Sequence, residues 1–92
     1  MHGLLVAVKI DPAGVDEAMK MLNEQVVPTV KSAPGFVAGY WMRDESAGMG
    51  YSIAIFDTEQ AATDARDNAP RPPDGAPVSI ANIQVLPVVA RA

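Results

Sequence analysis

Few side chains in this 92-residue sequence could perform chemistry on their own. It has no cysteine and a single histidine, His2, so no disulfide, thiolate metal site or serine–histidine–acid set can be assembled. The acidic residues, such as Asp44 and Glu45, follow predicted turns and helix surfaces without metal-ligand spacing, and we interpret them as solvated charge. The sequence therefore predicts no metal site and no cofactor, and it identifies no catalytic residue.

One group of residues around the only tryptophan stands out against this background. If residues 44–47 form a symmetric turn between two strands, Trp41 lies opposite Gly50. The same face of these strands then carries Arg43 and Ser52. A large ring beside a missing side chain either fills the gap by packing or forms the wall of a pocket, and both alternatives remain open.

The pocket alternative describes an apolar cavity with a few polar groups, as suits a flat organic ligand. Arg43 could stabilise a phenolate through a charge-assisted hydrogen bond, whereas no general base is evident near it. The candidate polar groups of such a pocket are Arg43, Ser52 and either Asn82 or Gln84.

The elements that must position these residues follow the order β-α-β-β-α-β, the ferredoxin-like arrangement. Period-two and strand-length apolar runs predict the strands, and apolar residues spaced by three and four predict the helices. The predicted strands cover residues 4–10, 36–43, 48–56 and 78–89, and the helical stripes cover residues 15–30 and 61–69.

Proline and capping signals predict where these elements stop. Pro28 lacks an amide hydrogen and clashes one turn back, so we expect a kink or a break of the first helix there. Asp57 with Gln60 three residues later predicts the start of the second helix. Residues 70–77 contain four prolines and one glycine and must form a loop.

Both faces of the predicted sheet are largely apolar, although two helices can cover only one of them. A domain of one 92-residue unit cannot bury the second face alone, and an exposed apolar face of this kind marks an interaction site. We therefore predict a homodimer in which two sheets pack face to face. The interface candidates are Tyr40, Met42, Tyr51, Ile53 and Ile55, with Tyr40 and Tyr51 as a cross-strand pair.

Two segments resemble the dimeric α/β-barrel superfamily, and within it the antibiotic-biosynthesis-monooxygenase-like (ABM) group. They are Pro34-Gly35-Phe36 at the start of the second strand, and Phe56-Asp57-Thr58-Glu59-Gln60-Ala61 at the end of the third. The order of elements matches over the whole chain, residues 1–92. The resemblance implies one domain whose sheet pairs with that of a second copy into a barrel, and a small-molecule pocket between helices and sheet.

The resemblance also implies functions, and the residues limit them. Phe56 stands where many oxygenases of the group have tryptophan, which makes it a further pocket candidate. The haem-degrading branch uses an asparagine in the first strand and a histidine on the helical side, but residues 4–10 contain no asparagine and His2 lies at a terminus. A cofactor-independent monooxygenase acting on an aromatic molecule is one hypothesis, and a non-catalytic structural or accessory domain is the other.

Charge and hydropathy exclude further classes of function. The net charge is −4 and the seven basic residues are scattered, so the basic stripe that nucleic-acid binding needs is absent. No apolar stretch approaches the roughly 20 residues of a membrane span, and residues 4–8 lack the flanks of a signal peptide. We therefore expect no nucleic-acid or membrane partner and a cytoplasmic location.

Overall fold

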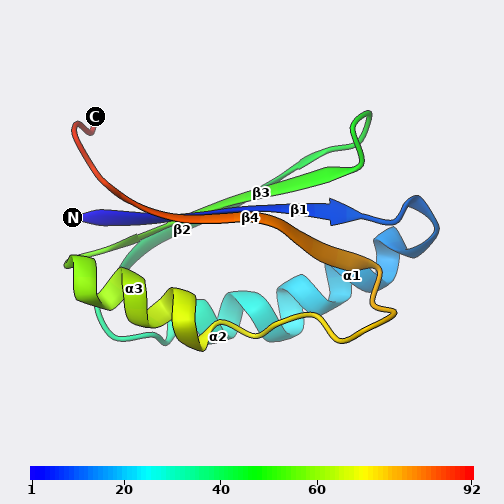
Figure 1. The fold of residues 1–92 in the computed structure, drawn as a ribbon, viewed down its shortest axis with the longest axis horizontal. Helices are drawn as coiled ribbons and strands as arrows, with labels where there is room; N and C mark the ends of the chain where they lie inside the picture. Colours follow the sequence, from blue (N-terminus) through cyan, green and yellow to red (C-terminus); the bar gives the residue numbers. More distant parts are fainter.

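A four-stranded antiparallel sheet with its helices on one face forms the structure, a computed structural model that describes residues 1–92 (Figure 1). The order of the strands across the sheet is β2-β3-β1-β4, so the first and third strands occupy the centre. This is the predicted ferredoxin-like arrangement, which is confirmed. The strands are β1 (His2–Ile10), β2 (Phe36–Asp44), β3 (Met49–Phe56) and β4 (Val78–Pro87).

The first helical region runs through Pro28 without the predicted break, and its irregularity takes the form of a π-helical turn just before the proline. A 3-10 turn, η1 (Pro12–Gly14), leads into α1 (Val15–Met21), then a π-helical turn η2 (Leu22–Val26) and α2 (Val27–Lys31). The amide of Val27 donates to the carbonyl of Leu22, five residues back. A π turn holds an extra residue, and this widening upstream accommodates a proline that would crowd the preceding turn of a regular α-helix.

The second helix, α3 (Glu59–Asn68), packs against β1, β3 and β4. Its N-cap is Thr58, whose Oγ1 accepts a hydrogen bond from the amide of Ala61 at 3.1 Å. The predicted cap at Asp57 is one residue too early, because the threonine hydroxyl satisfies the free amide instead. Residues 70–77 form a loop, as predicted, and run on the helical side of the sheet (Figure 1).

A small apolar core joins the sheet to α3. Leu4, Ala54, Phe56 and Ala62 form its buried centre, and the rings of Phe36 and Phe56 meet edge to face with centroids 6.0 Å apart. A β-bulge between Phe36 and Ala38 turns the Phe36 ring toward the helices. Strict alternation from Tyr40 and Met42, the interface candidates of this strand, would place Phe36 on the opposite face, because it does not anticipate an extra residue.

The hairpin of β2 and β3 has a register two residues from the symmetric one. Trp41 lies opposite Ser52, and Gly50 lies opposite Arg43. Tyr40 pairs with Ile53, so the expected direct pairing of the two tyrosines is wrong. A shift of two residues preserves the direction of every side chain, and the predicted faces of this hairpin therefore hold.

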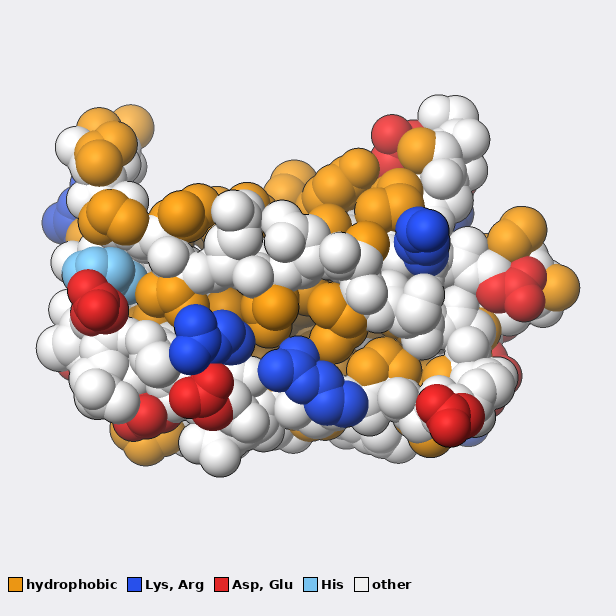
Figure 2. Space-filling model, in the orientation of Figure 1, with side chains coloured by type: hydrophobic (Ala, Val, Ile, Leu, Met, Phe, Trp, Pro, Cys, Tyr) orange, Lys and Arg blue, Asp and Glu red, His pale blue; other side chains and the backbone are white.

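The sheet face away from the helices carries exposed apolar side chains, and we call it the open face (Figure 2). Tyr40 is 64% exposed, Met42 57% and Ile53 36%. Figure 1 shows that the β2–β3 hairpin and the C-terminal segment both rise on this side, at opposite ends of the sheet. No helix of the structure has the length and apolar character needed to cross a membrane.

Candidate functional site

A cavity of about 260 Å³ lies between the sheet and the first helical region. Side chains of β1 that point toward the helices form its roof, α1 and η2 form its floor, and residues 69–73 of the proline-rich loop close one side. Figure 2 shows the corresponding apolar hollow below the sheet, with basic side chains beside it. Its apolar lining includes Leu4, Val6, Val8, Ile10, Ala18, Met19, Met21, Leu22, Val26, Val30, Ile80 and Ile83.

Trp41 is half-buried and lines this cavity from β2. A Cβ atom added at Gly39 would lie 3.0 Å from both Cη2 and Cζ3 of the indole, so the ring lies directly over this glycine. The two alternatives for Trp41 are thus not exclusive: the ring packs over a glycine of its own strand and also walls the cavity. Gly50 instead makes room for Val8 and Ile10, because a Cβ there would lie 3.0–3.1 Å from their side chains.

Polar groups at the cavity are few, and none of them is acidic. Ser52 lines it from the centre of β3, opposite Trp41, and Gln25 lines it from the π-helical turn. The charged lining residues are Arg43 and Arg71, and the cavity has no aspartate, glutamate, histidine or cysteine in its wall. Such a wall can hold an apolar ligand and orient one polar group, but it provides no side chain suited to act as general base at neutral pH.

The five residues predicted for a pocket occupy three different places. Trp41, Arg43 and Ser52 line the cavity. Phe56 is fully buried in the core beside it and is absent from the cavity wall. Asn82 lies on the open face, exposed and paired with Ala7, because a register shift at Ala81 places both Ile80 and Ile83 on the cavity side.

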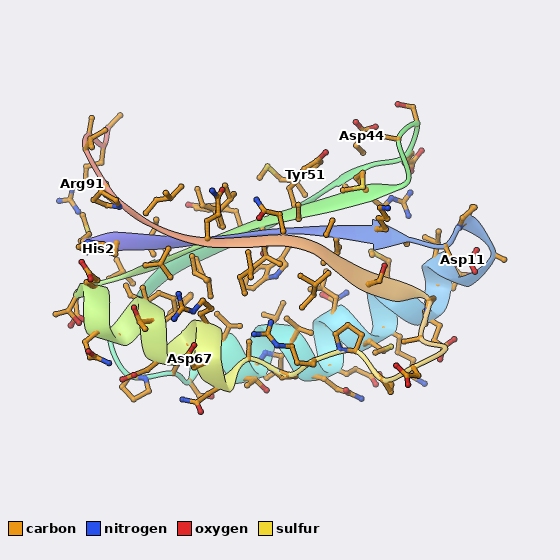
Figure 3. The ribbon with its side chains drawn as sticks, in the orientation of Figure 1. His2, Asp11, Asp44, Tyr51, Asp67 and Arg91 are labelled. Atoms are coloured by element: carbon orange, nitrogen blue, oxygen red, sulfur yellow. The ribbon has the colours of Figure 1, made fainter.

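The residues predicted for the dimer interface share the open face. Tyr40, Met42, Tyr51 and Ile53 are exposed, and Ile55 is half-buried beside Gly3. Figure 3 shows Tyr51 on the side of the sheet away from the helices. Whether they contact a second copy stays a prediction.

Two lining residues, Gln25 and Arg71, were missed by sequence reasoning. Gln25 lies next to the apolar stripe of the first helix in the sequence. Its side chain faces the cavity because it belongs to the π-helical turn η2, which the sequence does not predict. Arg71 stands among Pro70, Pro72 and Pro73, a segment interpreted only as a loop. A basic residue enclosed by prolines gives no periodic signal that would indicate a cavity wall.

The charged side chains of the β2–β3 turn interact with other residues of the same turn. Asp44 accepts hydrogen bonds from Ser46 Oγ at 2.8 Å and from the amide of Ala47 at 3.1 Å. These bonds stabilise the carboxylate, and the side-chain bond from Ser46 is the largest cause that lowers the pKa of Asp44. Glu45 forms an ion pair with Arg43. The predicted turn with solvated acidic side chains agrees with this geometry.

The sequence matches no protein-family model and no curated protein. Solved structures share its fold over the whole chain. The haem degrader MhuD from Mycobacterium tuberculosis, with two haems bound in its active site, is 12% identical with a TM-score of 0.75, covering 100% of this chain and 99% of that one. An antibiotic biosynthesis monooxygenase is 14% identical with a TM-score of 0.64, covering 98% and 100%.

A further Mycobacterium tuberculosis protein, Rv0793, is 12% identical with a TM-score of 0.60, covering 100% of this chain and 99% of that one. At such identities the likeness concerns the fold. The predicted resemblance to the antibiotic-biosynthesis-monooxygenase-like group is therefore confirmed as a likeness of fold.

Proposed function

We propose that this protein is a homodimer in which each subunit binds a small, flat, largely apolar organic molecule in the cavity beside Trp41. The observation that carries the proposal is the cavity itself, about 260 Å³ within a 92-residue chain. Protein interiors hold few voids larger than a water molecule, because unfilled volume costs stability. Ligand pockets range over about 300–1,000 Å³, and this cavity lies just below that range, so it suits a small molecule of two or three fused rings.

Structures of the same fold support binding of flat molecules. MhuD holds two haems in its active site. Haem iron takes histidine, cysteine, methionine or tyrosine as axial ligand, most often histidine in haem enzymes of the globin and peroxidase type. In this chain the only histidine, His2, lies outside the cavity wall, with Nε2 3.3 Å from Glu59. The residues present therefore do not fit a histidine-ligated haem. Met19 and Met21 of the wall are a residue type that can ligate haem iron, but a volume of about 260 Å³ suits a molecule smaller than a porphyrin, so we propose an organic ligand without iron.

The homodimer is supported by the surface area of the single chain. A folded monomer of 9.7 kDa exposes about 5,100 Å² on average, whereas this chain exposes 5908 Å². The excess, about 800 Å², equals the share that one partner buries in a standard protein interface. Because the open face holds the exposed Tyr40, Met42 and Ile53, it is the surface that a second sheet would cover.

A second candidate function, oxygenation of the bound molecule, is favoured by the likeness to an antibiotic biosynthesis monooxygenase. In an oxygenation that uses no redox cofactor the substrate itself supplies the electrons, and because the cavity wall holds no base the substrate would have to lose its proton to water. The oxidation of 1-naphthol by dioxygen to 1,4-naphthoquinone and water has this balance, since one oxygen atom enters the ring and the other leaves as water. This chemistry makes 1-naphthol a probe for both functions.

The test is calorimetric titration of the dimer with 1-naphthol under nitrogen, followed by oxygen uptake in air. We expect saturable binding of one molecule per subunit. Ser52→Leu should abolish it by filling the cavity from the centre of β3, whereas Ser79→Leu at an exposed position of β4 should leave it unchanged. Absence of binding to the wild type would refute the function, and binding without oxygen uptake would restrict it to a non-catalytic domain.

A further inference from the structure

The charged residues that line the cavity are both arginines, in a protein whose net charge is −4. An acidic protein whose only charged groups at this apolar cavity are cations creates a local potential there that favours anions. The two arginines differ, however, in whether their charge is already neutralised.

Arg43 is paired. Its guanidinium forms an ion pair with Glu45, two residues along the same turn. A ligand anion would have to displace this carboxylate or share the arginine with it. Arg43 is therefore a weaker anion site than the sequence indicated.

Arg71 has no carboxylate partner. One Nη2 hydrogen is donated to the backbone carbonyl of Arg66, at 3.1 Å, which ties the side chain to the end of α3. The remaining hydrogens of a guanidinium are arranged as a fork that matches the two oxygens of a carboxylate. Arg71 is exposed while it lines the cavity, so it stands at the mouth and not in the interior.

The backbone around Arg71 is restricted on both sides. Pro70 precedes it and Pro72 and Pro73 follow, and all three line the cavity. Proline fixes its own φ angle and limits the residue before it, so this segment has few alternative conformations. The arginine is thus presented at the mouth by a backbone that does not need to be ordered by the ligand.

We propose that the ligand is an aromatic carboxylate, with its rings in the cavity and its carboxylate at Arg71. This inference rests on the proposed function and names the class of molecule that the cavity selects. The apolar lining selects the rings, and the unpaired guanidinium at the mouth selects the anion.

The experiment compares 2-naphthoate with 2-naphthamide, which have the same shape and differ in charge. Calorimetric titration of the wild-type protein at pH 7 and low salt should give an affinity for the naphthoate about tenfold above that for the amide. A tenfold preference corresponds to about 1.4 kcal/mol, which lies above an ordinary exposed ion pair and near the lower end for a charge-assisted hydrogen bond. In Arg71→Gln, which keeps a donor for the Arg66 carbonyl, the naphthoate should weaken about tenfold while the amide changes less than about twofold.

Two matched variants separate local from general charge effects. Arg91→Gln removes the same charge from the C-terminal segment, which Figure 3 shows on the other side of the sheet, and should leave both affinities unchanged. Arg43→Gln should reduce naphthoate binding by less than Arg71→Gln does, because Glu45 already occupies that guanidinium. A larger loss in Arg43→Gln would overturn the assignment to Arg71.

The outcomes distinguish this inference from the function on which it rests. If naphthoate and amide bind the wild type equally, the carboxylate inference is refuted and the small-molecule site stands. If neither binds and 1-naphthol does not bind either, both are refuted. Equal preference for naphthoate in the wild type and Arg71→Gln also refutes the role of Arg71.

Discussion

The substitution Ile53→Asp tests whether the open face is the dimer interface. Ile53 lies at the centre of β3, paired with Leu5 on one side and Tyr40 on the other, and is 36% exposed in the single chain. In a lone subunit an aspartate there reaches water, so the variant should fold. In a dimer closed over this face, both carboxylates would enter an apolar interface without partners.

The expected loss of dimerisation free energy is the sum of two contributions from each subunit. Burying the isoleucine side chain contributes about 1.5–3 kcal/mol when complete, and less here because part of it is already covered. An unpaired buried carboxylate costs several kcal/mol. Two-fold symmetry doubles the sum, so the loss is at least about 6 kcal/mol, which corresponds to a dissociation constant raised by about 10⁴-fold.

Sedimentation equilibrium between 1 and about 100 micromolar measures this change, a range that suits an interface of ordinary size. The wild type should be dimeric throughout, and Ile53→Asp should be a folded monomer with unchanged far-ultraviolet circular dichroism. Gln60→Glu adds a negative charge to the exposed first turn of α3, on the helical side, and should remain dimeric. A wild-type monomer, or an Ile53→Asp dimer within tenfold of the wild-type affinity, would refute the assignment of the open face.

Three further predictions concern Gly35 before β2, the indole ring of Trp41 and the binding of haemin. Gly35→Ala should lower the free energy of unfolding in urea by about 2–4 kcal/mol, because φ is +81° and the new Cβ would lie 2.8 Å from that of Ala61. Gly75→Ala is the control: it has the same φ but no neighbour within 4 Å, so it should lower the free energy of unfolding by only about 1–2 kcal/mol. Trp41→Phe should weaken 1-naphthol about threefold to tenfold in calorimetric titration with the dimer intact, since a smaller ring stacks less well; unchanged affinity would exclude ring contact. Haemin should give no stoichiometric Soret band in either the wild type or His2→Ala, and a band that disappears in His2→Ala would show axial ligation by that residue.

The fold was predictable because its signals are repeated along the chain. Strand-length apolar runs and a helical stripe each involve many residues, so no single exception changes the outcome. The faces of the β2–β3 hairpin were predictable for a related reason. A register error of two residues moves Trp41 from Gly50 to Ser52 without moving it to another face.

Three of the differences between sequence and structure come from single inserted residues. A bulge at Val37 reverses the direction of Phe36, and one at Ala81 places Asn82 on the open face. The π-helical turn before Pro28 is a third insertion of this kind. Each inserted residue reverses or rotates the direction of the side chains that follow it, and the spacing of apolar residues in the sequence does not show where such an insertion occurs. Arg71 was missed because loop residues have no period at all.

The proline-rich wall of the cavity has a consequence for the entropy of binding. Four prolines among residues 70–77 restrict the unfolded chain as well as the folded one, so ordering this segment removes less conformational freedom than an ordinary loop of the same length would lose. A ligand that binds against residues 70–73 therefore has a smaller entropy cost, because it does not have to order this part of the backbone. For the proposed ligand, selectivity at the mouth would then depend on fit to a rim with few alternative conformations, and molecules with a displaced carboxylate would be rejected instead of being accommodated.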